Sequence, residues 1–237
     1  MTSPDLYGDS PNGLPPGALS IMRAAEGVFF ERGFHGTTLR ELARAANVSQ
    51  PLLYHYFASK HNLLVALCQG AVNTLIASMD EALSTCPSDP ELRLDALVTA
   101  HVTCEIRIRK SSFVANTEVR SLAEDARRAF EAKRAYVQDW YDRTILDGAE
   151  QGLFRTPYPQ ETSRAIASMC IAVSAWYRED GPLSPVEIAG RYATLARLAV
   201  GASSTGIAEP VPTERQTPPR RCDAHVGDVG QDHGPLR

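Results

Sequence analysis

Apolar side chains recur every three or four residues along most of this 237-residue chain. The first such stripe is formed by Ile21, Ala25, Val28 and Phe29, and comparable stripes continue as far as Ala199. This spacing is typical of one face of an amphipathic helix, and no stretch alternates with a period of two for long enough to form a strand. The sequence therefore predicts an all-α fold.

Residues with strong positional preferences mark the expected helix ends. Gly33 is a natural stop for the first helix, and Thr38 opens a short second one. Asn47 tolerates the left-handed backbone of a tight turn. Ser49 is a favourable N-cap, with Pro51 in the first turn that follows. The other starts and stops are predicted at Lys60, at residues 89–91, at Gly152 and at residues 181–182.

The two ends of the chain differ from the region between them. Residues 1–16 and 203–237 are rich in proline and poor in apolar side chains, so we expect them to be disordered. The formal net charge of −4 does not by itself indicate a nucleic-acid binder. The sequence begins without a secretory signal, and no uninterrupted apolar run approaches the roughly 18 residues of a membrane span. We therefore expect a cytoplasmic protein with no membrane partner.

No motif for catalysis or metal binding is present in the sequence. The five cysteines are far apart and odd in number, which provides neither zinc-ligand spacing nor a disulfide framework. Patterns for a nucleophile elbow, a zinc protease helix, a phosphate loop or a dinucleotide fold are missing. The sequence therefore predicts no enzyme, no metal site and no cofactor.

Residues 33–60 have the pattern of a helix-turn-helix unit. Its small apolar core is expected to contain Leu42, Ala46, Val48, Leu53 and Phe57. The side chains left to project from the second helix or its end are Gln50, Pro51, Leu52, Tyr54, His55 and Tyr56. A helix of this size fits the major groove, where base edges can be distinguished. Phosphate contacts are expected from Thr37, Thr38, Tyr54, Tyr56 and Lys60.

This segment resembles the DNA-binding domain of the TetR family of bacterial transcriptional regulators, and the predicted domain spans residues 17–66. The resemblance is carried by Gly-Phe-x-Gly-Thr-Thr at 33–38, Val-Ser at 48–49 and Leu-Tyr-x-x-Phe-x-Ser-Lys at 53–60. It implies that the residues nearest the DNA are Thr38, Arg40, Ser49, Gln50, Pro51, Leu52, Tyr54, His55 and Tyr56, with Lys60 on a phosphate.

Two features depart from the family pattern. Many relatives have glycine at the position of Asn47, and the arm before the first helix is usually rich in basic residues, whereas Arg23 is the first one here. Residues 17–66 carry five basic and three acidic side chains, a net charge of +2. We therefore expect moderate DNA affinity with a modest dependence on salt.

Residues 67–202 are predicted to form a helical ligand-binding and dimerisation domain. Segments 113–122 and 176–185 resemble actinobacterial regulators tied to lipid, steroid or acyl-CoA catabolism. The resemblance implies a homodimer formed by the last two helices, at about 159–180 and 184–201. The small and aliphatic residues suited to close packing there are Ala165, Met169, Ala172, Leu195 and Ala199.

The same resemblance implies a pocket for an unknown small-molecule effector among the helices at about 62–180. Its candidate lining residues are Cys104, Ile108, Phe113, Asn116, Trp140, Tyr141, Met169 and Val173. Trp140 and Tyr141 are equally typical of a packed core, and Asn116 and Glu118 could be internal braces instead of ligand contacts. The basic residues available to a CoA group are Arg107, Arg109, Lys110 and Arg164.

The leading hypothesis is a homodimeric repressor that a small, lipid-like or acyl-CoA ligand releases from a palindromic operator. Its two recognition helices would bind half-sites about 34–36 Å apart on double-stranded DNA. The alternative is a helical small-molecule-binding protein that has lost specific DNA binding, which the weakly basic domain motivates. A helical enzyme would need a catalytic constellation that the sequence lacks.

Overall fold

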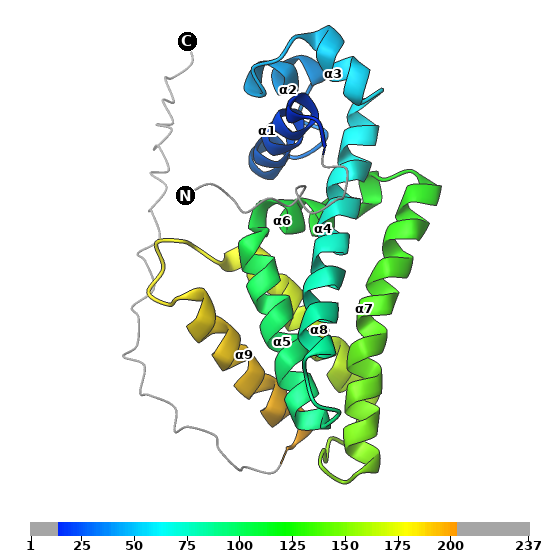
Figure 1. The fold of residues 1–237 in the computed structure, drawn as a ribbon, viewed down its shortest axis with the longest axis vertical. Coiled ribbons are helices and arrows are strands. Elements are labelled where there is room, and N and C mark those ends of the chain that lie inside the picture. Colours follow the sequence, from blue (N-terminus) through cyan, green and yellow to red (C-terminus); the bar gives the residue numbers. More distant parts are fainter. Residues whose placement is uncertain (1–13, 203–237) are drawn as a thin grey trace, which may run out of the picture. The chain divides into compact units, whose positions relative to one another are not determined.

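A computed structural model describes residues 14–202, and the regular elements in that range are all helical (Figure 1). They are α1 (Pro16–Arg32), α2 (Leu39–Ala45), α3 (Gln50–Tyr56), α4 (Lys60–Ser84), α5 (Pro90–Arg107), α6 (Arg109–Thr117), the short 3-10 helix η1 (Val119–Ser121), α7 (Glu124–Glu150), α8 (Pro159–Trp176) and α9 (Pro185–Val200). The all-α prediction is confirmed. The segments predicted to be disordered lie outside the described residues, except for residues 14–16, where α1 already begins at Pro16.

The local signals in the sequence mark the ends of the first helices correctly. Gly33 adopts a φ of 72° and ends α1, and its N–H donates to the Phe29 carbonyl at 2.9 Å. Thr38 caps α2 through a reciprocal pair of hydrogen bonds with Glu41. Asn47 has a φ of 54°, as the tight turn requires. The predicted turn therefore joins α2 and α3 where the sequence placed it.

One break in the bundle was not predicted from the sequence. Helix α5 ends at Arg107 and α6 begins at Arg109, because Ile108 leaves the helical region with φ −106° and ψ 31°. No glycine, proline or polar cap marks this position. Tertiary contacts hold it instead, since Arg109 Nε donates to the Ser174 carbonyl at 3.2 Å and its guanidinium lies 4.9 Å from the centre of the Phe30 ring.

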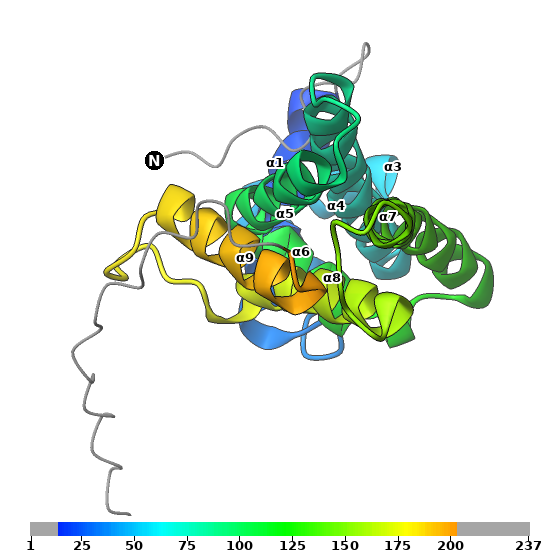
Figure 2. The ribbon, with the colours of Figure 1, turned by 90° about the horizontal axis from the view of Figure 1, so that it is seen from below.

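Helices α4 and α5 form the centre of the larger bundle (Figures 1 and 2). Helix α4 runs from the helix-turn-helix unit into the bundle and contacts α5, α6 and α7, and α5 also packs on α8 and α9. Contrary to the expectation from apolar runs, α4 is long and apolar enough to cross a membrane by length and composition alone. Its buried stripe, which includes Leu64, Leu67 and Met79, packs inside the protein, as in the core helix of a globular domain.

Candidate DNA-binding surface and effector cavity

Helix α3 presents an exposed face on top of a small buried core. Leu53 is fully buried beneath it, together with Leu42, Ala46 and Phe57, whereas Val48 is only half-buried. This core fixes the crossing of α2 and α3. The predicted DNA contacts that the structure leaves exposed on α3 are Gln50, Pro51, Leu52, Tyr54 and His55, and Tyr56 is half-buried.

Two of the predicted phosphate contacts are engaged inside the protein. Thr37 is only 2% exposed, and its hydroxyl donates to the Gly33 carbonyl at 2.9 Å, so this side chain does not project toward DNA as predicted. Lys60 Nζ donates to the carbonyls of Phe34 at 2.7 Å and Thr37 at 2.6 Å. An ammonium group has three N–H donors, so one remains for a phosphate. Lys60 therefore stabilises the loop before α2, whether or not it also contacts a DNA phosphate.

The N-terminus of α2 is already capped by its own residues. The Thr38 hydroxyl accepts from the Glu41 N–H at 3.3 Å, while the Glu41 carboxylate accepts from the Thr38 N–H and hydroxyl, both at 2.8 Å. These bonds from Thr38 hold the pKa of the Glu41 carboxyl below its usual value. Arg40 in the first turn stays exposed. An anion at the N-terminus of α2 would therefore contact Arg40 and the backbone N–H groups that remain unpaired. The Thr38 hydroxyl is already engaged with Glu41.

A set of polar contacts joins the helix-turn-helix unit to the rest of the protein. The Glu118 carboxylate, at the end of α6, accepts from the Phe34 N–H at 3.0 Å and from the Ser121 hydroxyl at 2.9 Å. Ser121 Oγ in turn lies 3.0 Å from His35 Nε2. Of the two roles open for Glu118, that of an internal brace is confirmed. We call Phe34, His35, Glu118 and Ser121 the α6 joint, because it ties the end of α6 to the loop before α2.

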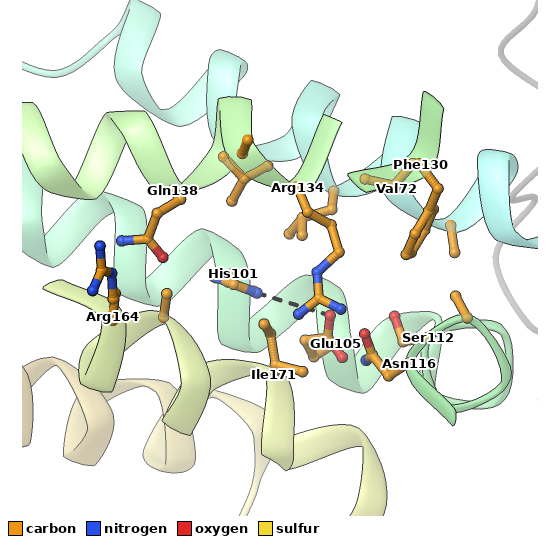
Figure 3. Close-up of a pocket in the computed structure, with 16 residues that line it drawn as sticks. Val72, His101, Glu105, Ser112, Asn116, Phe130, Arg134, Gln138, Arg164 and Ile171 are labelled. Carbon is orange, nitrogen blue, oxygen red and sulfur yellow. Dashed lines mark ion pairs between the residues drawn. The ribbon is translucent and has the colours of Figure 1, made fainter. Parts of the chain in front are cut away.

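A cavity of about 340 Å³ lies among α4, α5, α6, α7 and α8 (Figure 3). Most of its lining is apolar, but polar side chains enter it from several helices. The lining residues are Ala71, Val72, Leu75, His101, Glu105, Ser112, Ala115, Asn116, Phe130, Arg134, Ala135, Val137, Gln138, Arg164, Ala167 and Ile171. This volume is at the lower end of the range of small-molecule sites, about 300–1,000 Å³.

Most of the lining residues predicted from the sequence do not line this cavity. Of the eight candidates only Asn116 lines the cavity, and of the four basic candidates only Arg164 does. The seven that pack elsewhere are Cys104, Ile108, Phe113, Trp140, Tyr141, Met169 and Val173. Six of them belong to the core or pack against it, and Phe113 contacts the Phe30 ring. Single-sequence patterns do not specify how far each helix is rotated about its axis, and here other faces point into the cavity.

The polar lining residues that the prediction missed had a visible signal. Leu97, His101 and Glu105 follow one another at intervals of four, so the apolar stripe of α5 continues into two ionisable side chains. Polar residues on a buried stripe are unusual and indicate either a structural partner or a site. His101 lies on this stripe and is fully buried.

His101 and Glu105 are both titratable, and burial has opposite effects on them. Burial lowers the pKa of His101 to about 3, so its imidazole is neutral at pH 7. Burial raises the pKa of the Glu105 carboxyl to about 7, against smaller opposing effects of Ser174, Ser112 and Arg134. Figure 3 shows the Arg134 guanidinium directed toward Glu105. His101 Nε2 lies 3.8 Å from Glu105 Oε1, which is too long for a hydrogen bond.

The raised pKa of Glu105 predicts a pH-dependent stability. The folded protein holds a proton on this carboxyl that the unfolded chain releases, so stability is lost as pH rises from about 4.5 to about 7. We expect Glu105→Gln to stabilise the protein more at pH 8 than at pH 5, measured by thermal unfolding. The exposed control Glu131→Gln should show no such difference, and equal effects of Glu105→Gln at both pH values would contradict the buried carboxyl.

Within residues 14–202, no group of three or more His, Cys, Asp or Glu side chains is placed to hold a metal ion. Four cysteines in this range, Cys68, Cys86, Cys104 and Cys170, are free thiols. Cys222 lies outside the described residues. His61 Nε2 accepts a hydrogen bond from the Ala123 N–H at 3.1 Å.

Two family models match this chain and leave only a short gap between them. The model described as bacterial regulatory proteins, tetR family, matches residues 21–67, which include α2 and α3. The model described as the tetracyclin repressor-like C-terminal domain matches residues 87–200, which include most of the cavity lining.

Individual relatives agree with these matches. The transcriptional repressor KstR2 of Mycobacterium tuberculosis is 27% identical over 190 residues, covering 79% of this chain and 93% of the relative. A solved tetR-family regulatory protein from Rhodococcus RHA1 is 30% identical, with a TM-score of 0.75 over 80% of this chain and 100% of that one. AibR, solved with isovaleryl coenzyme A and operator DNA, shares the fold at 21% identity, with a TM-score of 0.70 over 79% of this chain and 100% of that one. With its exposed α3 and its helical C-terminal bundle, the chain belongs to the TetR family of bacterial transcriptional regulators.

Proposed function

We propose that this protein is a transcriptional repressor whose affinity for operator DNA changes when a small molecule binds the cavity. The observation that carries this proposal is that α4 and α6 both line the cavity and both connect to the helix-turn-helix unit. Helix α4 begins directly behind α3 and lines the cavity through Ala71, Val72 and Leu75. Helix α6 lines the cavity through Ser112 and Asn116 and ends in the α6 joint.

These shared helices suggest how the effector could act. A ligand shifts an equilibrium only if it binds one conformation better than the other. A ligand that spreads α4 and α6 apart would displace Glu118 and the loop before α2, and with them α3. We propose that the ligand-bound conformation no longer matches the operator, so that the ligand releases DNA.

In this proposal the DNA-binding domain comprises residues 17–66, and residues 67–202 bind the effector and form the dimer. The N-terminal part of α3, with Gln50, Pro51 and Leu52, would face base edges in the major groove. Arg40, Thr38, Tyr54 and Lys60 would hold phosphates and set the register. The alternative, a small-molecule receptor without specific DNA binding, is less favoured because α3 is intact and exposed.

A homodimer through α8 and α9 is supported by their unpartnered apolar surfaces. Trp176, Val186, Leu195 and Leu198 are 47%, 80%, 49% and 57% exposed in the single chain. The small residues Ala165, Ala172 and Ala199 are exposed on the same two helices, where they would let two copies approach closely. Large exposed apolar side chains on these two helices favour an interface over a surface that faces only solvent.

The cavity lining and one relative suggest a class of effector, and the family suggests where the protein acts. The relative AibR was solved with isovaleryl coenzyme A, and here Arg164 and Gln138 lie together at one end of the cavity (Figure 3). We propose a small apolar effector, with an acyl-CoA as the first class to test. A regulator of this kind acts in the cytoplasm and has no catalytic role.

The direct test is fluorescence anisotropy of the full chain with its own upstream intergenic DNA, at two salt concentrations and with scrambled competitor. Binding that survives the competitor supports a specific regulator. Acyl-CoA compounds can then be screened by release of the DNA. Binding no tighter than to scrambled DNA, repeated on neighbouring intergenic regions, would favour the receptor without an operator.

Tyr54→Phe removes one hydroxyl from the exposed face of α3 and tests the proposed phosphate contact. Tyr54 is 54% exposed, so the change should leave folding intact. We expect operator affinity to fall roughly tenfold, since a hydrogen bond to a charged group contributes about 1.5–3 kcal/mol. The matched control is Tyr136→Phe on α7, a tyrosine that is 50% exposed and far along the chain from α3. Unchanged affinity in Tyr54→Phe would remove Tyr54 from the interface.

A further inference from the structure

Two buried polar atoms that line the cavity have no hydrogen-bond partner. They are His101 Nε2 and Glu105 Oε2. The residues that carry them are 0% and 3% exposed, and both line the cavity. Buried polar atoms in folded proteins are nearly always paired, so each unpaired one requires an explanation. Here the two lie one helical turn apart on α5, which indicates a shared partner.

The hydrogen bonds of His101 determine what its free nitrogen offers. Nδ1 lies 3.0 Å from the Tyr141 hydroxyl, while the other acceptors near that hydroxyl are farther away, the Leu97 carbonyl at 3.4 Å and Cys170 Sγ at 3.9 Å. We assign the phenol proton to the shortest of these contacts, so that Nδ1 is the acceptor. The neutral imidazole then carries its own proton on Nε2, which is a donor to the cavity.

Glu105 supplies the complementary half of the site. Burial brings the pKa of its carboxyl to about 7, so it can donate or accept near neutral pH. The groups that face it are His101 on its own helix, Ser112 from α6, Arg134 from α7 and Ser174 from α8. Its Oε1 is 3.8 Å from His101 Nε2. The unpaired Oε2 belongs to the same carboxyl group and is therefore close enough to Nε2 for one ligand group to contact both residues.

Of a hydroxyl, a carbonyl, a carboxylate and an ammonium group, only the hydroxyl pairs with both residues in either protonation state of Glu105. A hydroxyl accepts from Nε2–H and then either donates to the carboxylate or accepts from the carboxylic acid. A carbonyl cannot pair with the ionised carboxylate, a ligand carboxylate would be repelled by it, and an ammonium cannot accept from Nε2–H.

We infer that the cavity binds an apolar ring or chain bearing an alcohol, with the hydroxyl held between His101 and Glu105. The hydrocarbon part would lie against the apolar walls, which include Val72, Leu75, Phe130, Val137 and Ile171. This inference rests on the proposed role of the cavity as the effector site and adds a feature of its ligand. It is independent of whether the far end of the ligand, near Arg164, carries a CoA group.

The test compares four probes of nearly equal shape by isothermal titration calorimetry on the full chain. They are 4-phenylcyclohexanol, phenylcyclohexane, 4-phenylcyclohexanone and 4-phenylcyclohexanecarboxylate. We expect the alcohol to bind at least roughly tenfold tighter than the hydrocarbon, as two new hydrogen bonds should provide. At pH 8 the ketone and the carboxylate should bind more weakly than the alcohol. Equal affinities for alcohol and hydrocarbon, or no binding by any probe, would overturn the inference.

Glu105→Leu keeps a side chain of similar size and removes the polar partner. The variant should bind phenylcyclohexane at least as well as the wild type and lose the preference for the alcohol. Glu131→Leu on the exposed surface of α7 is the matched control and should keep the preference. A preference that persists in Glu105→Leu contradicts the site. Operator binding, measured separately by anisotropy, tests the repressor itself, so failure of the alcohol subsite and failure of the proposed function are distinguishable.

Discussion

Leu53→Ala should destabilise the protein by about 2–5 kcal/mol, the usual cost of emptying a fully buried leucine site. Leu53 is 0% exposed and lies beneath α3, in the core that holds α3 against α2. Because this core is small, the surrounding helices have few other side chains to close the space. We expect a lower midpoint of thermal unfolding together with a loss of operator affinity, because α3 would no longer be held in a single orientation.

The neighbouring leucine provides a matched control. Leu52 is 37% exposed on α3, so Leu52→Ala should change the unfolding free energy by no more than about 0.5 kcal/mol. If it faces bases as proposed, the variant should nevertheless bind the operator more weakly. The two substitutions thus separate folding from recognition with adjacent residues. Similar unfolding midpoints for Leu53→Ala and the wild type would contradict the position of α3.

Leu198→Glu should convert the proposed homodimer into a folded monomer. Leu198 is 57% exposed on α9 in the single chain, so a carboxylate there is tolerated until a second copy covers it. Burial of an unpaired charge in an interface is strongly unfavourable. A monomer binds one half-site at a time, so operator affinity should fall by roughly 10²–10⁴, the usual gain from binding through two linked sites.

Sedimentation velocity and anisotropy on the same samples provide the measurement. Leu146→Glu on α7 is the matched control, since Leu146 is 42% exposed on a helix outside the proposed interface. It should remain dimeric with wild-type operator affinity. A Leu198→Glu protein that stays dimeric would place the interface elsewhere, and a monomeric wild type would remove the dimer from the proposal.

The helix-turn-helix unit could be predicted from the sequence because short-range interactions define it. Thr38 bonds to Glu41 three residues on, Ser49 accepts from the Leu52 N–H, and Asn47 supplies the left-handed turn between them. Each of these signals is contained within four residues. The identity of the residues on the exposed face of α3 follows directly from such a short helix with one buried leucine.

The cavity could not be predicted in the same way, because its residues come from five helices. The Tyr141 hydroxyl meets His101 across 40 positions, and Arg134 approaches Glu105 from a separate helix. The break at Ile108, which carries no local signal, turns α6 across the bundle and brings Ser112 and Asn116 into the lining. The sequence pattern identified apolar stripes but did not specify how far each helix rotates.

The contacts of Lys60 and Glu118 also could not be predicted from the sequence. Both side chains bond to the loop before α2. From the sequence Lys60 is a free cation at a helix start, but the structure bonds its ammonium to the carbonyls of Phe34 and Thr37. Glu118 reaches the Phe34 N–H from 84 residues away. The all-α class, the ends of the first helices and the exposed face of α3 were determined by the sequence itself, because neighbouring residues decide them. Only the tertiary structure decided which polar side chains share the cavity and the α6 joint, because those contacts depend on how separate helices pack.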